Sequence, residues 1–145
     1  MRDRTTVQTV TMLYGAVFLA VGILGFIPGI TTDYGDLSFA GDGSEAKLLG
    51  IFQVSILHNI VHLLFGIAGI ALARTFETAR TYLLGAGLIY IVLFVYGLFV
   101  GNNDSPNFVP INNADDLLHL VLGIALLGSW YISREGAPTT ATTAT

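Results

Sequence analysis

Four long apolar runs, separated by short polar segments, dominate the hydrophobic pattern of the chain. A helix needs about 20 apolar residues to cross the roughly 30 Å hydrocarbon core of a bilayer, and each run approaches or exceeds that length. Inside a bilayer the backbone amides find partners only within a helix or a closed barrel. The pattern therefore predicts four transmembrane helices, over residues 10–27, 49–73, 82–101 and 114–133.

These spans predict an all-α integral membrane protein, a four-helix bundle that forms one domain of residues 1–135. The tail, residues 136–145, is composed of small and polar residues without anchoring side chains, which predicts disorder. The composition agrees with a bilayer environment. Hydrophobic residues make up 53% of the chain and charged residues 11%, against about 45–50% and about 25% in soluble domains.

The distribution of charge predicts the orientation of the helices. Basic residues precede the first span, flank the loop between the second and third, and follow the fourth, whereas the other two loops are mainly acidic. Because cytoplasmic loops are enriched in Lys and Arg, we expect both termini in the cytoplasm. The net charge of −4 and the lack of a basic stripe give no support to a nucleic-acid partner. The basic residues at these places are Arg2, Arg4, Arg74, Arg80 and Arg134, and Lys47 is the only base in the other two loops.

The second and fourth spans contain similar segments, "HNIVHLLFGIA" at residues 58–68 and "DDLLHLVLGIA" at 115–125, which are identical at five of eleven positions. Both spans run in the same direction through the membrane. The repeat therefore predicts two helical hairpins related by a pseudo-two-fold axis along the membrane normal, with a site at the repeat interface. His62 and His119 would approach each other across that axis.

Polar residues recur at helical spacing in both segments. Ser55, Asn59, His62 and Gly66 lie on one helical face, and Asn112, Asp116, His119 and Gly123 repeat the spacing. His58 and Asp115 lie one turn before the histidines, and Gly66 and Gly123 are predicted helix-packing positions. A charged Asp on the lipid face costs about 2.5–3.5 kcal/mol, so this polar set is expected to face the bundle interior. The predicted cluster comprises His58, Asn59, His62, Asn112, Asp115, Asp116 and His119.

The cluster supports three functional hypotheses. In the first, its hydrogen bonds hold the helices together, at about 0.6–2 kcal/mol each. Tyr90 and Tyr96 in the third span could hydrogen-bond the polar cluster or an interface, and helix packing is the favoured role for both. This hypothesis favours a structural, accessory or interaction protein of the lipid bilayer, in a homo-oligomer or a larger membrane complex.

The second hypothesis is a transition-metal or haem site. His58, His62 and His119, with Asp115 or Asp116, would form a shell for zinc or copper, since histidines four residues apart on a helix form a two-nitrogen clamp. Alternatively, His62 and His119 would be the two axial ligands of haem b, with Gly66 and Gly123 leaving room for the ring.

The third hypothesis is a small-solute or proton transport component that uses the same polar line. The cytoplasmic halves of the second and fourth spans contain almost no polar residue, which weakens this hypothesis. The sequence shows neither a nucleophile paired with a base nor a phosphate-binding loop, so no enzymatic activity is expected.

The segments "LGIFQVSILHNIVHLLFGIAGI" and "FVPINNADDLLHLVLGIAL" resemble a prokaryotic membrane family, the domain of unknown function 4383. The most specific motifs are His-Asn-x-x-His-x-x-x-Gly at residues 58–66 and Asn-x-x-Asp-x-x-x-His-x-x-x-Gly at 112–123, and the resemblance covers most of residues 9–133. It implies four transmembrane helices and no particular activity. With the charge distribution, it predicts a multi-pass protein of the prokaryotic plasma membrane.

Overall fold

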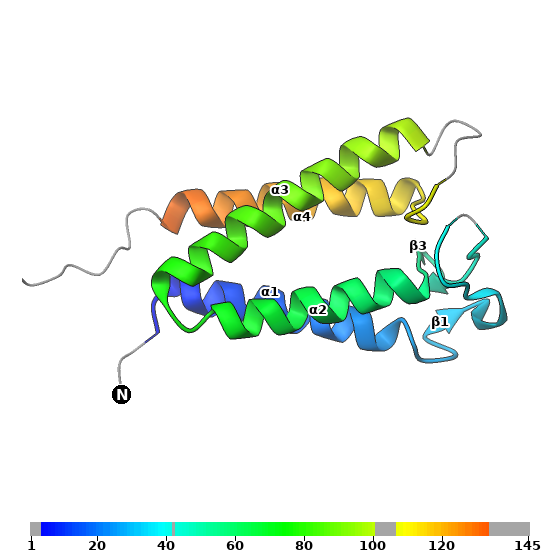
Figure 1. The fold of residues 1–145 in the computed structure, drawn as a ribbon, viewed down its shortest axis with the longest axis horizontal. Coiled ribbons are helices and arrows are strands. Elements are labelled where there is room, and N and C mark those ends of the chain that lie inside the picture. Colours follow the sequence, from blue (N-terminus) through cyan, green and yellow to red (C-terminus); the bar gives the residue numbers. More distant parts are fainter. Residues whose placement is uncertain (1–3, 42, 101–106, 134–145) are drawn as a thin grey trace, which may run out of the picture.

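The structure, a computed structural model, describes residues 4–41, 43–100 and 107–133. Its described part contains four α-helices arranged as two hairpins (Figure 1). The predicted four-helix bundle is confirmed: α1 packs mainly against α2, and α3 mainly against α4. The helices are α1 (Thr6–Leu24), α2 (Ile56–Leu72), α3 (Phe76–Val100) and α4 (Asn113–Ile132).

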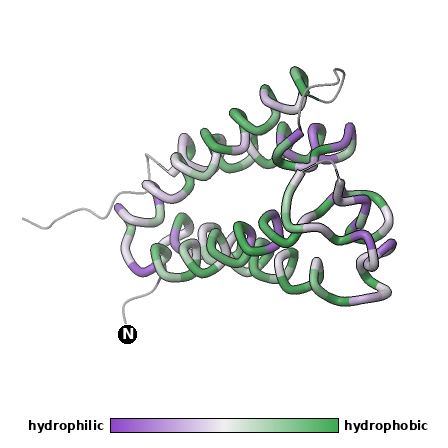
Figure 2. The backbone as a smooth tube through the Cα atoms, turned by 45° about the vertical axis from the view of Figure 1, so that its right-hand side comes forward, coloured by the Kyte–Doolittle hydropathy of each residue, from purple (hydrophilic) through white to green (hydrophobic). Residues whose placement is uncertain are grey.

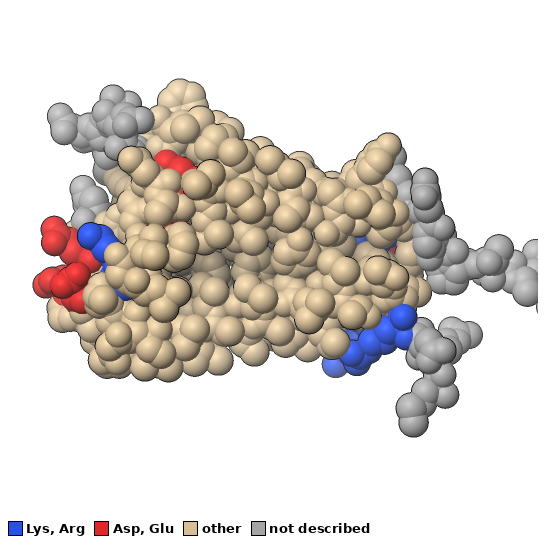
Figure 3. Space-filling model, turned by 180° about the vertical axis from the view of Figure 1, so that it is seen from behind, with Lys and Arg blue, Asp and Glu red and all other residues tan. Residues whose placement is uncertain are grey.

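The helices have the length and composition of membrane spans. α1, α3 and α4 are each long and apolar enough to cross a bilayer. α2 is also apolar and has 17 residues, about 26 Å at the usual rise. Hydrophobic residues follow the helices while hydrophilic ones gather at their ends (Figure 2), and a broad uncharged band separates charged groups at the two ends (Figure 3). The chain is therefore a membrane protein.

The prediction that the second span begins at residue 49 is wrong. α2 begins at Ile56, and the residues before it form the short strands β2 (Lys47–Leu48) and β3 (Phe52–Gln53). The turn that joins these strands contains Leu49 and Gly50, with φ of 55° and 72°. These values lie in the left-handed region, which a right-handed helix cannot include. The apolar residues of this turn resemble a continuation of the span in hydropathy alone.

The other helix bounds differ from the predictions mainly at their starts. α1 begins at Thr6, since Thr5 and Gln8 form a capping box there, and α3 begins at Phe76. Capping groups set these starts, and a hydropathy pattern does not detect them. α4 agrees with its prediction to within one residue at each end. The predicted disordered tail, residues 136–145, lies outside the described residues.

The segment between α1 and α2 is folded, a feature that the sequence analysis did not predict. It contains β1 (Thr31–Thr32), a short 3-10 helix (Tyr34–Asp36), and an antiparallel sheet of order β1-β2-β3. Ala46, Leu48 and Val54 are buried beneath it. The backbone N–H of Gln53 donates to the carboxylate of Asp115 at 3.0 Å, so the sheet is attached to the start of α4. We call this the sheet end of the bundle.

Glycines allow the helices of each hairpin to approach closely. A Cβ added at Gly66 of α2 would lie 2.5 Å from the backbone nitrogen of Leu19 in α1. In the second hairpin, a Cβ at Gly123 of α4 would lie 2.6 Å from the Cδ1 atom of Ile91 in α3. These two glycines therefore lie where the paired helices approach closely, and a larger residue would collide with the partner helix.

Contacts in one hairpin have counterparts in the other. Each contacting residue of the α1 segment has a counterpart in α3 at one constant difference in residue number. Each contacting residue of α2 has a counterpart in α4 at the same difference that separates the two repeated segments in the sequence. Such matching is what a pseudo-two-fold axis would require, although the axis itself stays a prediction. The matched contacts are Gly15–Ile70 with Gly87–Leu127, Phe18–His62 with Tyr90–His119, Leu19–Gly66 with Ile91–Gly123, and Gly25–Asn59 with Gly97–Asp116.

Candidate functional site

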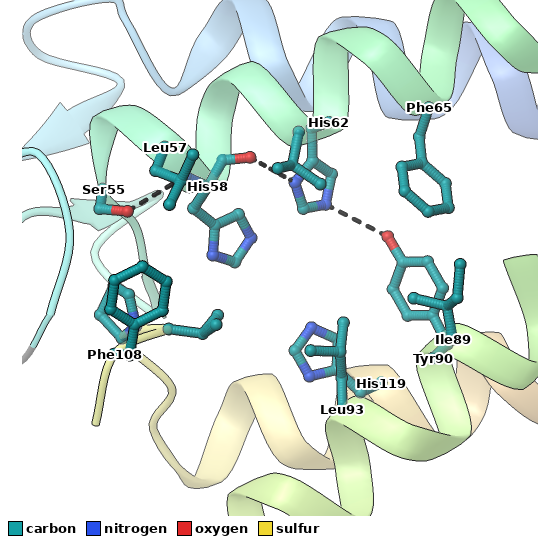
Figure 4. Close-up of a pocket in the computed structure, with 13 residues that line it drawn as sticks. Ser55, Leu57, His58, His62, Phe65, Ile89, Tyr90, Leu93, Phe108 and His119 are labelled. Carbon is teal, nitrogen blue, oxygen red and sulfur yellow. Dashed lines mark hydrogen bonds between the residues drawn. The ribbon is translucent and has the colours of Figure 1, made fainter. Parts of the chain in front are cut away.

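A cavity of about 280 Å³ lies between the two hairpins, near the sheet end. The first turns of α2 form one wall, α3 and α4 form the opposite wall, and residues 108–110 contribute its edge. Figure 4 shows the rings of His58, His62 and His119 pointing into this space from both sides. Most of the remaining lining is aliphatic or aromatic, as at Leu57 and Phe65.

The hydrogen bonds of His62 fix its tautomer. Its Nδ1 lies 3.0 Å from the carbonyl oxygen of His58, which can only accept, so Nδ1 carries the proton. Nε2 is then an acceptor, and the hydroxyl of Tyr90 lies 3.3 Å from it and donates. Because His62 is on α2 and Tyr90 on α3, this bond joins the two hairpins (Figure 4).

The aromatic rings around the cavity form a continuous set of contacts. The rings of His58 and His62 are nearly parallel, with centroids 4.5 Å apart. Tyr90 stacks on Phe18 at 5.3 Å and meets the edge of His119 at 5.4 Å. Tyr90, for which the sequence favoured helix packing over a hydrogen bond to the polar cluster, therefore lies at the centre of the site.

Two imidazole nitrogens at the cavity are buried without a hydrogen-bond partner among the described residues. They are the Nδ1 atoms of His58 and His119, and the His119 side chain is only 3% exposed. Leaving such a polar atom unsatisfied costs about 1–3 kcal/mol. Both imidazole rings therefore retain hydrogen-bonding capacity that the described residues do not use.

Asp115 and Asn112 do not face the cavity but cap α4. The Oδ2 atom of Asp115 accepts hydrogen bonds from the backbone N–H groups of Gln53 and Asn112, both at 3.0 Å. The Oδ1 atom of Asn112 accepts from the N–H groups of Ala114 and Asp115. Both predicted polar residues thus build the start of the helix and its junction with the sheet.

The predicted metal shell of His58, His62, His119 and Asp115 is not assembled in this structure. Among the described residues, no group of three or more His, Cys, Asp or Glu side chains is placed to hold a metal ion. The physical reasons are visible in the contacts. Asp115 is engaged by backbone amides, His58 and His62 stack rather than converge, and Tyr90 faces Nε2 of His62.

Asn59 and Asp116 lie within their own hairpins. A Cβ added at Gly25 would collide with the side-chain amide of Asn59, which is 1% exposed. A Cβ at Gly97 would collide with the carboxylate of Asp116. Helical spacing placed these residues on one face with the histidines. The crossing helices divide that face between the cavity and the two hairpin interfaces.

Phe18 and the segment that carries Phe108 were absent from the predicted site. Phe18 is 1% exposed and contacts the ring of His62 at 5.9 Å. Phe108 lines the cavity from the connection that precedes α4. A comparison of the first span with the third would have paired Phe18 with Tyr90, whereas no periodic pattern in the sequence points to Phe108.

Comparison with known proteins identifies a family. The family model described as "Domain of unknown function (DUF4383)" matches residues 8–131 of the chain. No curated protein and no solved structure matches it. The matched region contains all four helices except the first residues of α1 and the last residue of α4. The chain therefore belongs to the family of domain of unknown function DUF4383.

Proposed function

We propose that this protein is a small accessory protein of the membrane, without catalytic activity, that holds a lipid-soluble molecule between its two hairpins. The observation that carries the proposal is the 280 Å³ cavity, with its apolar walls and its three imidazole rings. Such a combination of apolar lining and few convergent polar groups is typical of small-molecule sites. The imidazoles of His58 and His119, which line the cavity, would supply the polar recognition.

The cavity is bordered by residues that face the bilayer. Val61 on α2 and Ile89 on α3 line it, and their side chains are 40% and 46% exposed. The helices α2 and α3 contact each other much less than the two helices within each hairpin do. A molecule dissolved in the membrane would therefore enter sideways, between α2 and α3.

The interior beyond the cavity favours binding over transport. Phe65 and Tyr90 line the cavity and belong to the same hydrophobic core as the buried residues Ala79, Leu83 and Leu126. Packed apolar side chains of this kind offer no polar path for an ion or a proton. The site therefore resembles a cup that is open on one side.

We propose that the cavity lies in the outer half of a prokaryotic plasma membrane, with both termini in the cytoplasm. Acidic side chains gather at the sheet end, where Lys47 also lies, and arginines lie at the opposite end (Figure 3). Arg4 precedes α1 and Arg74 follows α2 at that opposite end, whereas Asp33, Asp36 and Glu45 belong to the folded segment. The positive-inside rule supports this orientation.

The proposal is tested with protein purified in mild detergent, analysed by native mass spectrometry and by solvent extraction. We expect a small molecule to be retained by the wild type and by Ile67→Trp, which alters a lipid-facing residue that is 57% exposed. Val61→Trp should lose it, because the indole would fill the cavity. Equal retention of compounds by all three proteins would overturn the proposal. The same spectra would test for a homo-oligomer.

A further inference from the structure

We infer that the ligand is a neutral, flat ring bearing hydrogen-bonding oxygens and an apolar tail, the chemistry of a quinone or quinol. This inference rests on the proposed binding function and specifies the class of ligand. Four properties of the cavity carry it: its lack of charge, the hydrogen-bonding capacity of its imidazoles, the arrangement of its rings, and the direction in which it opens.

The lining favours an uncharged head group. Among the described residues that line the cavity, none is Lys, Arg, Asp or Glu. The nearest carboxylates are turned away, since Asp115 bonds to backbone amides and Asp116 lies against Gly97. A phosphate or carboxylate buried here would lack an opposite charge, which low-polarity surroundings make very costly. A neutral ring with oxygen substituents carries no such penalty.

The imidazoles can form hydrogen bonds with both the oxidised ligand, a quinone, and the reduced ligand, a quinol. A neutral imidazole has one donor and one acceptor nitrogen, so His58 and His119 can donate to a carbonyl oxygen or accept from a hydroxyl. The two rings face the space from opposite hairpins (Figure 4). Two oxygens on one ring would give each histidine a partner, and their Nδ1 atoms lack one among the described residues.

The aromatic contacts favour a flat ligand. The parallel rings of His58 and His62 and the ring of Tyr90, which stacks on Phe18, line the cavity and can offer a face or an edge to a further ring. Offset stacked and edge-to-face arrangements contribute about 0.5–1.5 kcal/mol beyond the burial of area. A flexible acyl chain would gain less from these surfaces than a planar group would.

The position of the opening suits a molecule with a long tail. Val61 and Ile89, which border the cavity, face the bilayer, so a tail attached to the ring would continue into lipid. Phe108, 62% exposed, covers the edge nearest the sheet end. A bound molecule would thus keep its ring in the protein and its tail in the membrane.

Two matched probes test the inference: decylbenzoquinone, and decylbenzene, which has the same tail on a flat six-membered ring without oxygens. Their apparent affinities are obtained from thermal unfolding in detergent at equal probe-to-micelle ratios, because a ligand that binds the folded state raises the midpoint. We expect the wild type to bind the quinone about tenfold more tightly, as one or two added hydrogen bonds would give.

Variants assign that preference to the histidines. His119→Phe keeps a flat ring but removes both nitrogens, and should weaken the preference for the quinone, because only His58 is left to bond an oxygen. Tyr82→Phe is the matched control, since it removes a buried hydroxyl bond to the Phe65 carbonyl outside the cavity, and should keep the preference. His58→Phe is measured in parallel, so that misfolding of one variant leaves the test intact.

The outcomes separate the two proposals. Equal affinity of the wild type for both probes would overturn the quinone inference while leaving a cavity that binds apolar molecules. A quinone preference that is undiminished in both His119→Phe and His58→Phe would also overturn it. If neither probe raises the unfolding midpoint of the wild type, the proposed binding function fails as well.

Discussion

The two hairpins use similar sequences in different ways at the sheet end. In the first, His58 and His62 follow the capping residue Ser55, whose hydroxyl accepts from the N–H of His58. In the second, Asn112 caps α4 at the corresponding position. Yet Asp115, which corresponds to His58, bonds to the backbone of Asn112 and of the sheet. One position therefore supplies a cavity ring in one hairpin and a structural anchor in the other.

A second difference lies at the contact between the hairpins. Phe18 and Tyr90 occupy corresponding positions and stack on each other, and each also meets a histidine of its own hairpin. Only Tyr90 has a hydroxyl, which reaches across to His62. The glycine contacts are matched in both hairpins and shape the scaffold, whereas the unmatched positions make the cavity asymmetric and chemically specific.

The largest expected effect comes from filling the glycine contacts. Gly66→Ala places a Cβ 2.5 Å from a backbone nitrogen of Leu19, and backbone cannot easily move aside. Overpacking of this kind costs about 1–3 kcal/mol, so we expect a clear fall in the free energy of unfolding, measured by steric trapping in micelles.

Gly123→Ala is the matched comparison. Its new Cβ meets the end of the Ile91 side chain at 2.6 Å, and a side chain can change rotamer. We therefore expect a smaller loss of stability than for Gly66→Ala. Equal losses would show that the two helix crossings are constrained alike, and the contrast between backbone and side-chain contacts would have to be abandoned.

The next effect concerns the positions of Asp115 and His58. Asp115→Ala removes the acceptor for two backbone N–H groups and should destabilise the protein by about 1–2 kcal/mol, as losses of helix caps do. His58→Ala leaves the start of α2 capped by Ser55 and should cost less. Thermal unfolding of both variants checks the order, and a larger loss for His58→Ala would contradict the anchoring role of Asp115.

The helices could be predicted from the sequence because long apolar runs have few alternatives in a bilayer. The error at residues 49–55 arose where a turn and the strand β3 are as apolar as a span. Hydropathy measures how well a side chain suits an apolar environment and does not report backbone conformation. Here the left-handed backbone at Leu49 and Gly50 forms a turn where hydropathy predicted a helix.

The site was only partly predictable for a related reason. Helical spacing correctly grouped polar residues by face, but one face of α2 contacts both α1 and α3. His62 reaches Tyr90, while Asn59, near it on the same helix, is buried against Gly25. Likewise, the capping role of Asp115 depends on Gln53, which is distant in sequence. Such divisions follow from how the helices cross, and spacing along one helix does not contain that information.

The smallest effect tests the hydroxyl that makes the two hairpins unequal. Tyr90→Phe gives both positions a phenylalanine and removes the bond to Nε2 of His62, while the stack on Phe18 remains. Hydrogen bonds between membrane helices average about 0.6 kcal/mol, so unfolding should change little. The side-chain nitrogen resonances of His62 should shift, because Nε2 loses its donor and the Nδ1 bond to the His58 carbonyl is kept. Tyr82→Phe should leave those resonances unchanged. An unaltered His62 spectrum in Tyr90→Phe would mean that the hydroxyl does not join the hairpins, and that the difference between Phe18 and Tyr90 has no consequence for the cavity.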